Sequence, residues 1–230
     1  MHKQTRFAVL CALLVVAGSV LAAAQTFVSP GIHPISGRRY AQTMSYLGAD
    51  WLDRAERVQE ENPDAALDAL KLVPGSTVAD VGAGSGYMTV KMAKRVGLDG
   101  RVYANDIQPQ MLTLLRQRLD RERLGNVNLV LGTLTDPRLP DDTIDLILMV
   151  DVYHEFSEPQ AMLRKMRTSL KANGRLVLLE YRKEDPSIPI RPDHKMSVAE
   201  AKMEVEAEGF ILSTVDERLP GQHILVFTKK

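Results

Sequence analysis

The sequence has almost no cysteine and no net charge, and each shortage excludes a class of site or partner. Cys11 is the only cysteine, so a disulfide within the chain and a metal site built from several thiolates are excluded. The 29 Lys and Arg balance the 29 Asp and Glu, which leaves no overall field that would attract nucleic acid or an acidic membrane surface. We therefore expect no nucleic-acid partner.

Three catalytic or binding motifs are also missing. The sequence contains no G-x-x-x-x-G-K-[ST], which disfavours nucleoside-triphosphate binding through a P-loop. His154 and Glu155 begin a possible H-E-x-x-H, but position 158 is Glu, and the other histidines after residue 24 lie far away in sequence at His33, His194 and His223. We therefore expect no metal site. The stretch "GAGSG" does not have the spacing of the G-x-S-x-G serine nucleophile.

The first 24 residues differ from the remainder of the chain. A basic stretch at 1–6 precedes an uncharged apolar run at 7–24 that ends in "AAAQ". This pattern predicts a signal peptide cleaved before Gln25, and thus export to the periplasm or the medium. The alternatives are an uncleaved membrane anchor formed by residues 7–24, and a cytoplasmic protein whose start was assigned too early. The basic residues favour the cytoplasm for 1–6, which would send the following domain outward.

The remaining sequence predicts an N-terminal extended segment with a helical cap at 25–72, followed by one domain at 73–230. Residues 25–46 are rich in Gly, Pro, Ser and Thr, whereas 48–72 have the apolar spacing of one or two helices. With 230 residues, of which 45% are hydrophobic, the chain is long enough for one sizeable core.

From Thr77 onward, patterns typical of strands and helices alternate. We expect strands at 77–81, 101–106, 126–132, 143–151 and 175–181, helices at 86–96, 109–123, 158–171 and 197–208, and an antiparallel strand pair at 210–219 and 223–229. Such alternation predicts an α/β fold with a Rossmann-like, doubly wound sheet of seven strands, mostly parallel with a C-terminal antiparallel pair and preceded by N-terminal helices. Ligands of such sheets bind at the carboxyl ends of the strands.

A glycine-rich turn, "TVADVGAGSGYMTV", follows the first predicted strand. Gly82, Gly84 and Gly86 give backbone that can adopt positive φ or approach a ligand closely. Tyr87 stands where the dinucleotide pattern G-x-G-x-x-G needs its last glycine, which argues against a nicotinamide oxidoreductase. The tighter spacing suits a smaller charged group, such as the carboxylate of an amino-acid-like ligand. The alternative is that the glycines only allow tight packing of strand and helix.

Asp106 ends the second predicted strand, 20 residues after Gly86. A carboxylate at this position can accept hydrogen bonds from both hydroxyls of a ribose. The alternative is a carboxylate that caps the helix beginning near Pro109.

These stretches resemble the class I S-adenosylmethionine-dependent methyltransferases. "VADVGAGSG" is similar to their motif I, Asp106 to their strand-two acid, and "LPDDTIDLILMVDVYHEF" and "LKANGRLVLLEY" to their fourth- and fifth-strand regions. The resemblance covers roughly residues 70–230. It implies S-adenosyl-L-methionine as cofactor, with Asp106 on the ribose and four residues around the methionine part: Asp80, Gly82, Gly84 and Gly86. The stretch after strand three lacks the usual nearby acid for the adenine amine, and Thr133 occupies that neighbourhood.

Candidate catalytic residues follow the fourth predicted strand, in "VDVYHEF". Methyl transfer mainly requires a nucleophile held in line with the methyl group, and a base helps a weakly acidic acceptor. We expect Asp151 to line the cofactor sulfonium and His154 to act as base or as a hydrogen-bond partner of the substrate, with Tyr153 beside them. The alternatives are a histidine that only stabilises the loop and a tyrosine packed in the wall.

The sequence thus predicts a methyltransferase that acts on an unidentified small-molecule acceptor. Two segments are expected to shape the acceptor site, the helix that contains Trp51 and the long loop after strand five at 181–197. The alternative function is a non-catalytic nucleoside-binding or S-adenosylmethionine-binding protein of the cell envelope, derived from a methyltransferase fold. Export leaves open how the domain obtains a cofactor made in the cytoplasm. An anchored domain facing the cytoplasm would avoid that conflict.

Overall fold

The computed structural model describes residues 31–230. The predicted signal peptide or anchor at 1–24 lies outside the described residues. Within residues 31–230, none of the helices combines the length and the apolar character that crossing a membrane requires.

The described residues form a seven-stranded sheet in the order β3-β2-β1-β4-β5-β7-β6. Its strands are β1 (Thr77–Val81), β2 (Arg101–Asp106), β3 (Val127–Leu131), β4 (Ile144–Val150), β5 (Leu170–Tyr181), β6 (Phe210–Asp216) and β7 (Gln222–Lys229). The first five are parallel, and β7 pairs antiparallel with both β5 and β6. The predicted doubly wound sheet with a C-terminal antiparallel pair is therefore confirmed.

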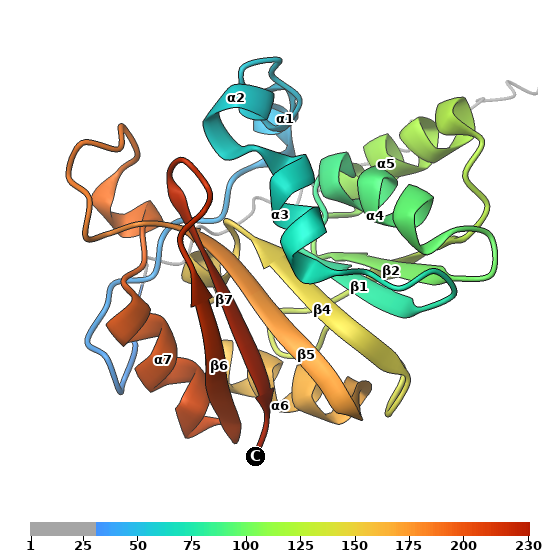
Figure 1. Cartoon of the computed structure of the whole chain (residues 1–230). Helices are drawn as coiled ribbons and strands as arrows, with labels where there is room; N and C mark the ends of the chain where they lie inside the picture. Colours follow the sequence, from blue (N-terminus) through green and yellow to red (C-terminus); the bar gives the residue numbers. More distant parts are fainter. Residues whose placement is uncertain (1–30) are drawn as a thin grey trace, which may run out of the picture.

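Helices cover both faces of this sheet (Figure 1). One face packs on α3 (Pro63–Leu70), α4 (Tyr87–Val96) and α5 (Pro109–Glu122), and the other on α6 (Pro159–Ser169) and α7 (Val198–Ala207). Successive residues of a strand point to opposite faces. Val78 accordingly belongs to the first core and Ala79 to the second. Burial on both faces explains why β1 and β4 are almost continuously apolar.

The N-terminal cap consists of short helices rather than the one or two that the sequence predicted. A 3-10 turn, η1 (Tyr46–Gly48), precedes α1 (Ala49–Leu52) and α2 (Arg57–Glu61), and α3 follows directly. The break before α3 has a local cause, because Asn62 adopts a left-handed conformation with φ 48° and caps α3 by accepting a hydrogen bond from the amide of Ala65. Pro63 then occupies the first turn, where its missing N–H costs nothing.

The strand β5 begins earlier than predicted. Helix α6 ends at Ser169, and the sequence "ANG" at 172–174, which we expected to stop the helix, lies within the strand instead. Leu170 pairs with Ile144, and the register shifts before Leu146 meets Arg175.

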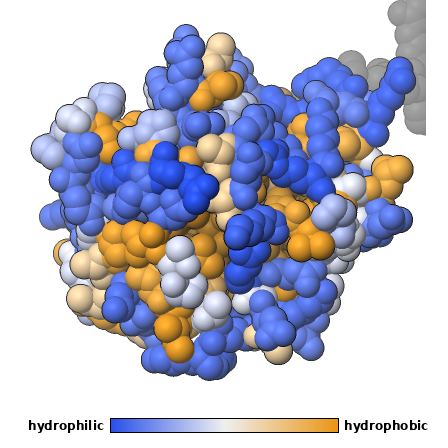
Figure 2. Space-filling view, viewed as in Figure 1, coloured by the Kyte–Doolittle hydropathy of each residue, from blue (hydrophilic) through white to orange (hydrophobic). Residues whose placement is uncertain are grey.

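Apolar side chains gather on the surface over the antiparallel end of the sheet, as Figure 2 shows from the same viewpoint as Figure 1. Ile211 and Val215 of β6 are exposed at this end.

The carboxyl ends of β1, β2 and β4 meet at one edge of the sheet. Two short 3-10 turns lie at this edge, η2 (Tyr153–Glu155) after β4 and η3 (Pro192–His194) in the connection from β5 to α7. The N-terminal segment reaches the same edge, since the side-chain amide of Gln108 donates to the carbonyl of Met44 and accepts from the amide of Tyr46. Three separate parts of the chain thus enclose the edge.

Candidate functional site

The turn after β1 can be built only with glycine. Gly82, Gly84 and Gly86 have φ of 75°, 55° and 89°, values that side chains rarely adopt. A Cβ would lie 2.3 Å from Val152 at the first position, 2.7 Å from Leu52 at the second and 2.0 Å from a Leu115 methyl at the third. Gly82 and Gly84 line a cavity at the sheet edge.

Gly86 has a different role from the other two glycines. It is the N-cap of α4 and lies against Leu115 of α5, and it does not line the cavity. The alternative of tight strand-to-helix packing therefore applies to this residue. The predicted contact of the cofactor with the turn is restricted to Gly82 and Gly84.

Asp106 connects the end of β2 to the glycine turn. Its Oδ2 accepts from the amide of Gly84 at 3.0 Å and its Oδ1 from the amide of Gln108 at 2.8 Å. Burial raises the pKa of this carboxyl, and the backbone donors oppose the shift. The carboxylate thus holds the turn that leads into α5, but α5 itself has no side-chain cap, contrary to the alternative. It also lines the cavity, and each oxygen retains a lone pair for a ligand.

The cavity beside the glycine turn is a narrow cleft with a volume of about 100 Å³. Its walls include Asp106, Thr133 and Asp151, which places three of the predicted cofactor residues around one space. The hydroxyl of Thr133 accepts from the amide of Asp136 at 3.0 Å, so the turn after β3 fixes its position. Leu134 and Met111 add apolar surface next to it.

Asp80 lies behind the turn and does not line either cavity, contrary to the role predicted for it beside the methionine part. Its Oδ2 accepts from the hydroxyl of Thr89 at 2.5 Å, which attaches the first turn of α4 to β1. Burial raises the pKa of Asp80 to about 6. The side chain therefore supports the glycine turn from within the core.

A second and wider cavity of about 550 Å³ adjoins the first. Asp151 and Glu155 line both. The remaining walls come from the two segments that the sequence analysis assigned to the acceptor site, with Trp51 and Arg54 on one side and Ile190 on the other. The two cavities together give a cleft with room for two ligands that meet at Asp151.

Asp151 is strained and incompletely bonded. Its φ of 51° is left-handed, a conformation that is costly for a residue with a side chain and is concentrated at functional sites. Its Oδ2 accepts from the side-chain amide of Gln222 at 2.7 Å, while its Oδ1 is buried and has no hydrogen-bond partner among the described residues. Burial raises the pKa of Asp151 well above its usual range, and the charges of Glu61 and Glu180 raise it further. A cationic ligand next to Asp151 would stabilise its ionised form and lower its pKa.

His154 is held by a buried carboxylate that the sequence analysis did not single out. Its Nδ1 lies 2.5 Å from Oε2 of Glu180, and the other oxygen of Glu180 accepts from the amide of Tyr153 at 3.0 Å. Burial alone would lower the pKa of His154, but Glu180 outweighs this effect and the pKa is raised. The signal in the sequence was a single acid near the end of the apolar stretch "RLVLLEY".

Tyr153, which the sequence predicted beside Asp151 and His154, lines neither cavity. The side chain is fully buried in the core on the α6 side of the sheet. Its ring lies edge-on to Phe156 and 5.8 Å from the guanidinium of Arg38. The turn η2 directs Tyr153 into the core and His154 toward the wider cavity. The position of Tyr153 agrees with the alternative of a packed tyrosine.

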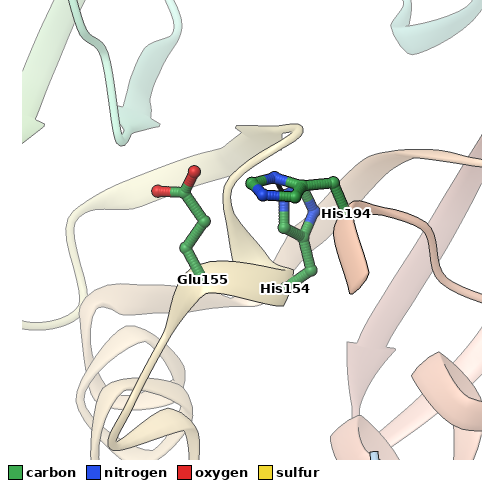
Figure 3. A group of neighbouring side chains, drawn as sticks. All are labelled: His154, Glu155 and His194. Carbon is green, nitrogen blue, oxygen red and sulfur yellow. Dashed lines mark hydrogen bonds between the residues drawn. The ribbon is translucent and has the colours of Figure 1, made fainter. Parts of the chain in front are cut away.

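Two further polar residues at this edge were missed as members of a site. Glu155 lines both cavities, and burial raises its pKa to about 7. His194 of η3 lies beside His154, with its Nδ1 3.1 Å from Nε2 of that residue. Figure 3 shows the two imidazole rings close together and overlapping in the view, with the Glu155 side chain beside them and its carboxylate pointing away from the rings. Sequence distance alone had suggested that these histidines would not meet.

Comparison with known proteins shows which family this chain resembles. Residues 78–174 match a family described as "Methyltransferase domain". A ubiquinone/menaquinone biosynthesis C-methyltransferase, UbiE of Vibrio campbellii, is 36% identical over 118 residues, which are 51% of this chain and 46% of the relative. The chain thus matches less than half the length of that relative, and the matched part supports the cofactor domain rather than the acceptor.

Solved structures agree with the family match. A SAM-dependent methyltransferase from Aquifex aeolicus is 28% identical, with a TM-score of 0.76 over 80% of this chain and 98% of that one. A TehB-like SAM-dependent methyltransferase from Corynebacterium glutamicum shares the fold at 18% identity, with a TM-score of 0.60 over 80% and 98% of the two chains. The comparisons support a class I SAM-dependent methyltransferase and imply S-adenosylmethionine as its cofactor.

Proposed function

We propose that this chain transfers a methyl group from S-adenosylmethionine to a small acceptor bound in the wider cavity. The observation that carries the proposal is the bond from the amide of Gly84 to Asp106 at the mouth of the narrow cleft. This hydrogen bond joins the glycine turn after β1 to the carboxylate of Asp106, which is suited to accept from ribose hydroxyls. Both occur at the carboxyl edge of a doubly wound sheet, where such folds bind ligands.

The lining of the cleft fits the cofactor. The bare backbone at Gly82 and Gly84 leaves room for the methionine end, Asp106 would accept from the ribose, and Thr133 with Leu134 would border the adenine. Asp151 lines both cavities, and a positively charged sulfonium beside it would stabilise its ionised form. When bound, S-adenosylmethionine supplies the electrophilic methyl group.

His154 is placed to receive the proton of the acceptor. As the methyl carbon bonds to the acceptor, its bond to sulfur breaks and the electron pair stays on sulfur, which leaves S-adenosylhomocysteine. A neutral acceptor also gives up one proton. Glu180 accepts the Nδ1–H of His154, so Nε2 keeps its lone pair. That lone pair faces Nδ1 of His194 at 3.1 Å on the wall of the wider cavity, and His194 would turn aside as the acceptor approaches. A general base in such a position accelerates proton transfer by about 10²–10⁴-fold.

The acceptor is a small molecule with an apolar body. Trp51, Leu52 and Ile190 line the wider cavity, and the guanidinium of Arg54 stacks 3.9 Å from the centre of the Trp51 ring. Such a wall suits a ring or chain that carries a polar group toward Asp151 and His154. The relatives are named for ubiquinone and menaquinone biosynthesis, so hydroquinones are the first acceptors to test on this chain.

Turnover of a His154→Ala variant tests the mechanism. The chain would be incubated with methyl-labelled S-adenosylmethionine and a panel of phenols, catechols and hydroquinones. With an accepted substrate, we expect kcat to fall at least about 100-fold in His154→Ala. The affinity for the cofactor should change no more than about three-fold, because His154 does not line the narrow cleft.

His223→Gln is the matched control, because His223 also pairs with carboxylates and lies outside both cavities. Unchanged kcat in His154→Ala would remove His154 from the mechanism. Tight cofactor binding without product from any member of the panel would favour the alternative, a non-catalytic S-adenosylmethionine-binding protein.

A further inference from the structure

We propose that His154, Glu155 and His194 form a binding site for one divalent transition-metal ion on the wall of the wider cavity. One ligand atom from each of the three residues lies within 4.8 Å of the others. All three side chains line the wider cavity, so an ion could enter from solvent and keep open coordination positions toward the acceptor.

The two imidazole nitrogens already have the spacing of metal ligands. Nε2 of His154 and Nδ1 of His194 lie 3.1 Å apart. Histidine nitrogens bind Zn²⁺ at about 2.0–2.1 Å, and two ligands at that distance lie about 3.0–3.4 Å apart for coordination angles between 90° and tetrahedral. The carboxylate of Glu155 needs a rotation of its side chain to reach the same ion. Within residues 31–230, its one hydrogen bond comes from the amide of Met44, at 3.3 Å.

Glu180 prepares His154 for this role. With the Nδ1–H directed at Glu180, the nitrogen that faces His194 is Nε2 with its lone pair. A histidine that donates its second N–H to a carboxylate is the usual arrangement around protein-bound zinc, where the carboxylate fixes the tautomer and strengthens the ligand. Glu180 is itself fully buried and anchored by the amide of Tyr153, so the arrangement is rigid.

The donor set selects the class of ion. Two imidazoles and one carboxylate suit Zn²⁺, Fe²⁺ or Co²⁺, whereas Mg²⁺ and Ca²⁺ prefer ligands that are all oxygen. Ion binding stands apart from methyl transfer and can be tested with the metal alone. Its use in catalysis rests on the proposed function. An open position would bind an acceptor hydroxyl and lower its pKa, and His154 would then act as a ligand instead of a base.

Metal titration of the untagged full chain, stripped with EDTA, tests the site. We expect Zn²⁺ to bind by calorimetry at one ion per chain, and Co²⁺ to give visible absorption bands of bound cobalt. Mg²⁺ should give no such heat. In His194→Ala the affinity for Zn²⁺ should fall at least about 100-fold. In Glu180→Gln it should fall about 10–100-fold, the range found for partners of metal-binding histidines.

Asp193→Asn is the matched control, because Asp193 lies in the same turn but pairs with Arg191. It should bind Zn²⁺ like the wild type. His194 is only half-buried on a short turn, so its replacement should leave the unfolding midpoint nearly unchanged. Absence of Zn²⁺ binding by the wild type, or equal binding by wild type and His194→Ala, would overturn the proposal. Neither result depends on whether the chain turns over S-adenosylmethionine.

Discussion

Gly86 and Gly75 illustrate two different reasons for a glycine, a positive φ and a lack of space for a Cβ. Both have positive φ, 89° at Gly86 and 83° at Gly75. A Cβ at Gly75 would meet nothing within 4 Å, whereas one at Gly86 would lie 2.0 Å from Leu115, a fully buried residue of α5. Gly75 is needed only for its positive φ. Gly86 is needed for its positive φ and also because a Cβ would collide with Leu115.

We predict that Gly86→Ala loses about 2–4 kcal/mol of unfolding free energy, from the left-handed backbone and from overpacking against Leu115. Gly75→Ala should lose only about 1 kcal/mol, because it has the backbone term alone. Urea unfolding of both variants measures the difference. Equal losses would show that the contact with Leu115 does not constrain the turn.

Asp80 should make stability depend on pH. Its folded pKa of about 6 lies above the ordinary value of 3.8, so the folded state retains a proton that the unfolded state releases between these values. The stability of the wild type therefore falls as pH rises from about 4 to 6. Full ionisation costs about 3 kcal/mol at higher pH, since each pKa unit corresponds to about 1.4 kcal/mol.

We predict that Asp80→Asn is more stable than the wild type by up to about 3 kcal/mol at pH 7.5, and that this advantage disappears below about pH 4. The amide oxygen can still accept from Thr89, which preserves the local hydrogen bond. Urea unfolding across this pH range provides the measurement. An advantage of the same size at every pH would show that ionisation of Asp80 is not its cause.

Among the elements, the N-terminal segment is held to the domain by one buried ion pair. Nε and Nη2 of Arg38 each lie 3.0 Å from a different oxygen of Glu204 in α7, and Nη1 donates to the carbonyl of His154 at 2.9 Å. Both side chains are buried. One arginine thus links the segment before α1 to α7 and to the turn that carries His154.

We predict that Arg38→Met destabilises the chain by about 3–5 kcal/mol, because it removes the arginine charge that pairs with the buried Glu204 and leaves only the Ser36 hydroxyl and His33 beside it. The double variant Arg38→Met with Glu204→Gln should regain more than half of that loss, since no unpaired charge remains. Thermodynamic unfolding of the single and double variants forms the test. A double variant less stable than the Arg38→Met variant would contradict the explanation.

The strands and the glycine turn were predictable because their signals are local. The apolar stretch at β1, its glycines and Asp106 lie within 30 residues, and parallel strands bring their ends together without further information. His154 and His194 are 40 positions apart, and they meet only because the connection after β5 folds back over the edge. The burial of Tyr153 could not be predicted, because the direction of a side chain in a single 3-10 turn leaves no periodic pattern in the sequence.

At the scale of the whole described structure, the cleft at the carboxyl ends of the strands has two parts, and different segments of the chain line each part. The narrow part takes most of its lining from the ends of β1, β2 and β4 and the turns after β1 to β4, within the stretch that matches the methyltransferase family, and the rest from Thr43, Met44 and Leu52. The wider part takes most of its lining from the N-terminal helices and from the connection after β5, which lie outside that match. The acceptor should therefore be determined by the parts of the chain that the family match does not include.

Calorimetry of the full chain with S-adenosylmethionine and S-adenosylhomocysteine tests the central claim most directly. We predict one binding event per chain for each ligand, and an affinity at least about 10-fold weaker in Asp106→Asn, which loses a charged acceptor for the ribose. Asp136→Asn, outside the cavity lining, should bind like the wild type. Absence of binding by the wild type, or undiminished binding by Asp106→Asn, would contradict the account.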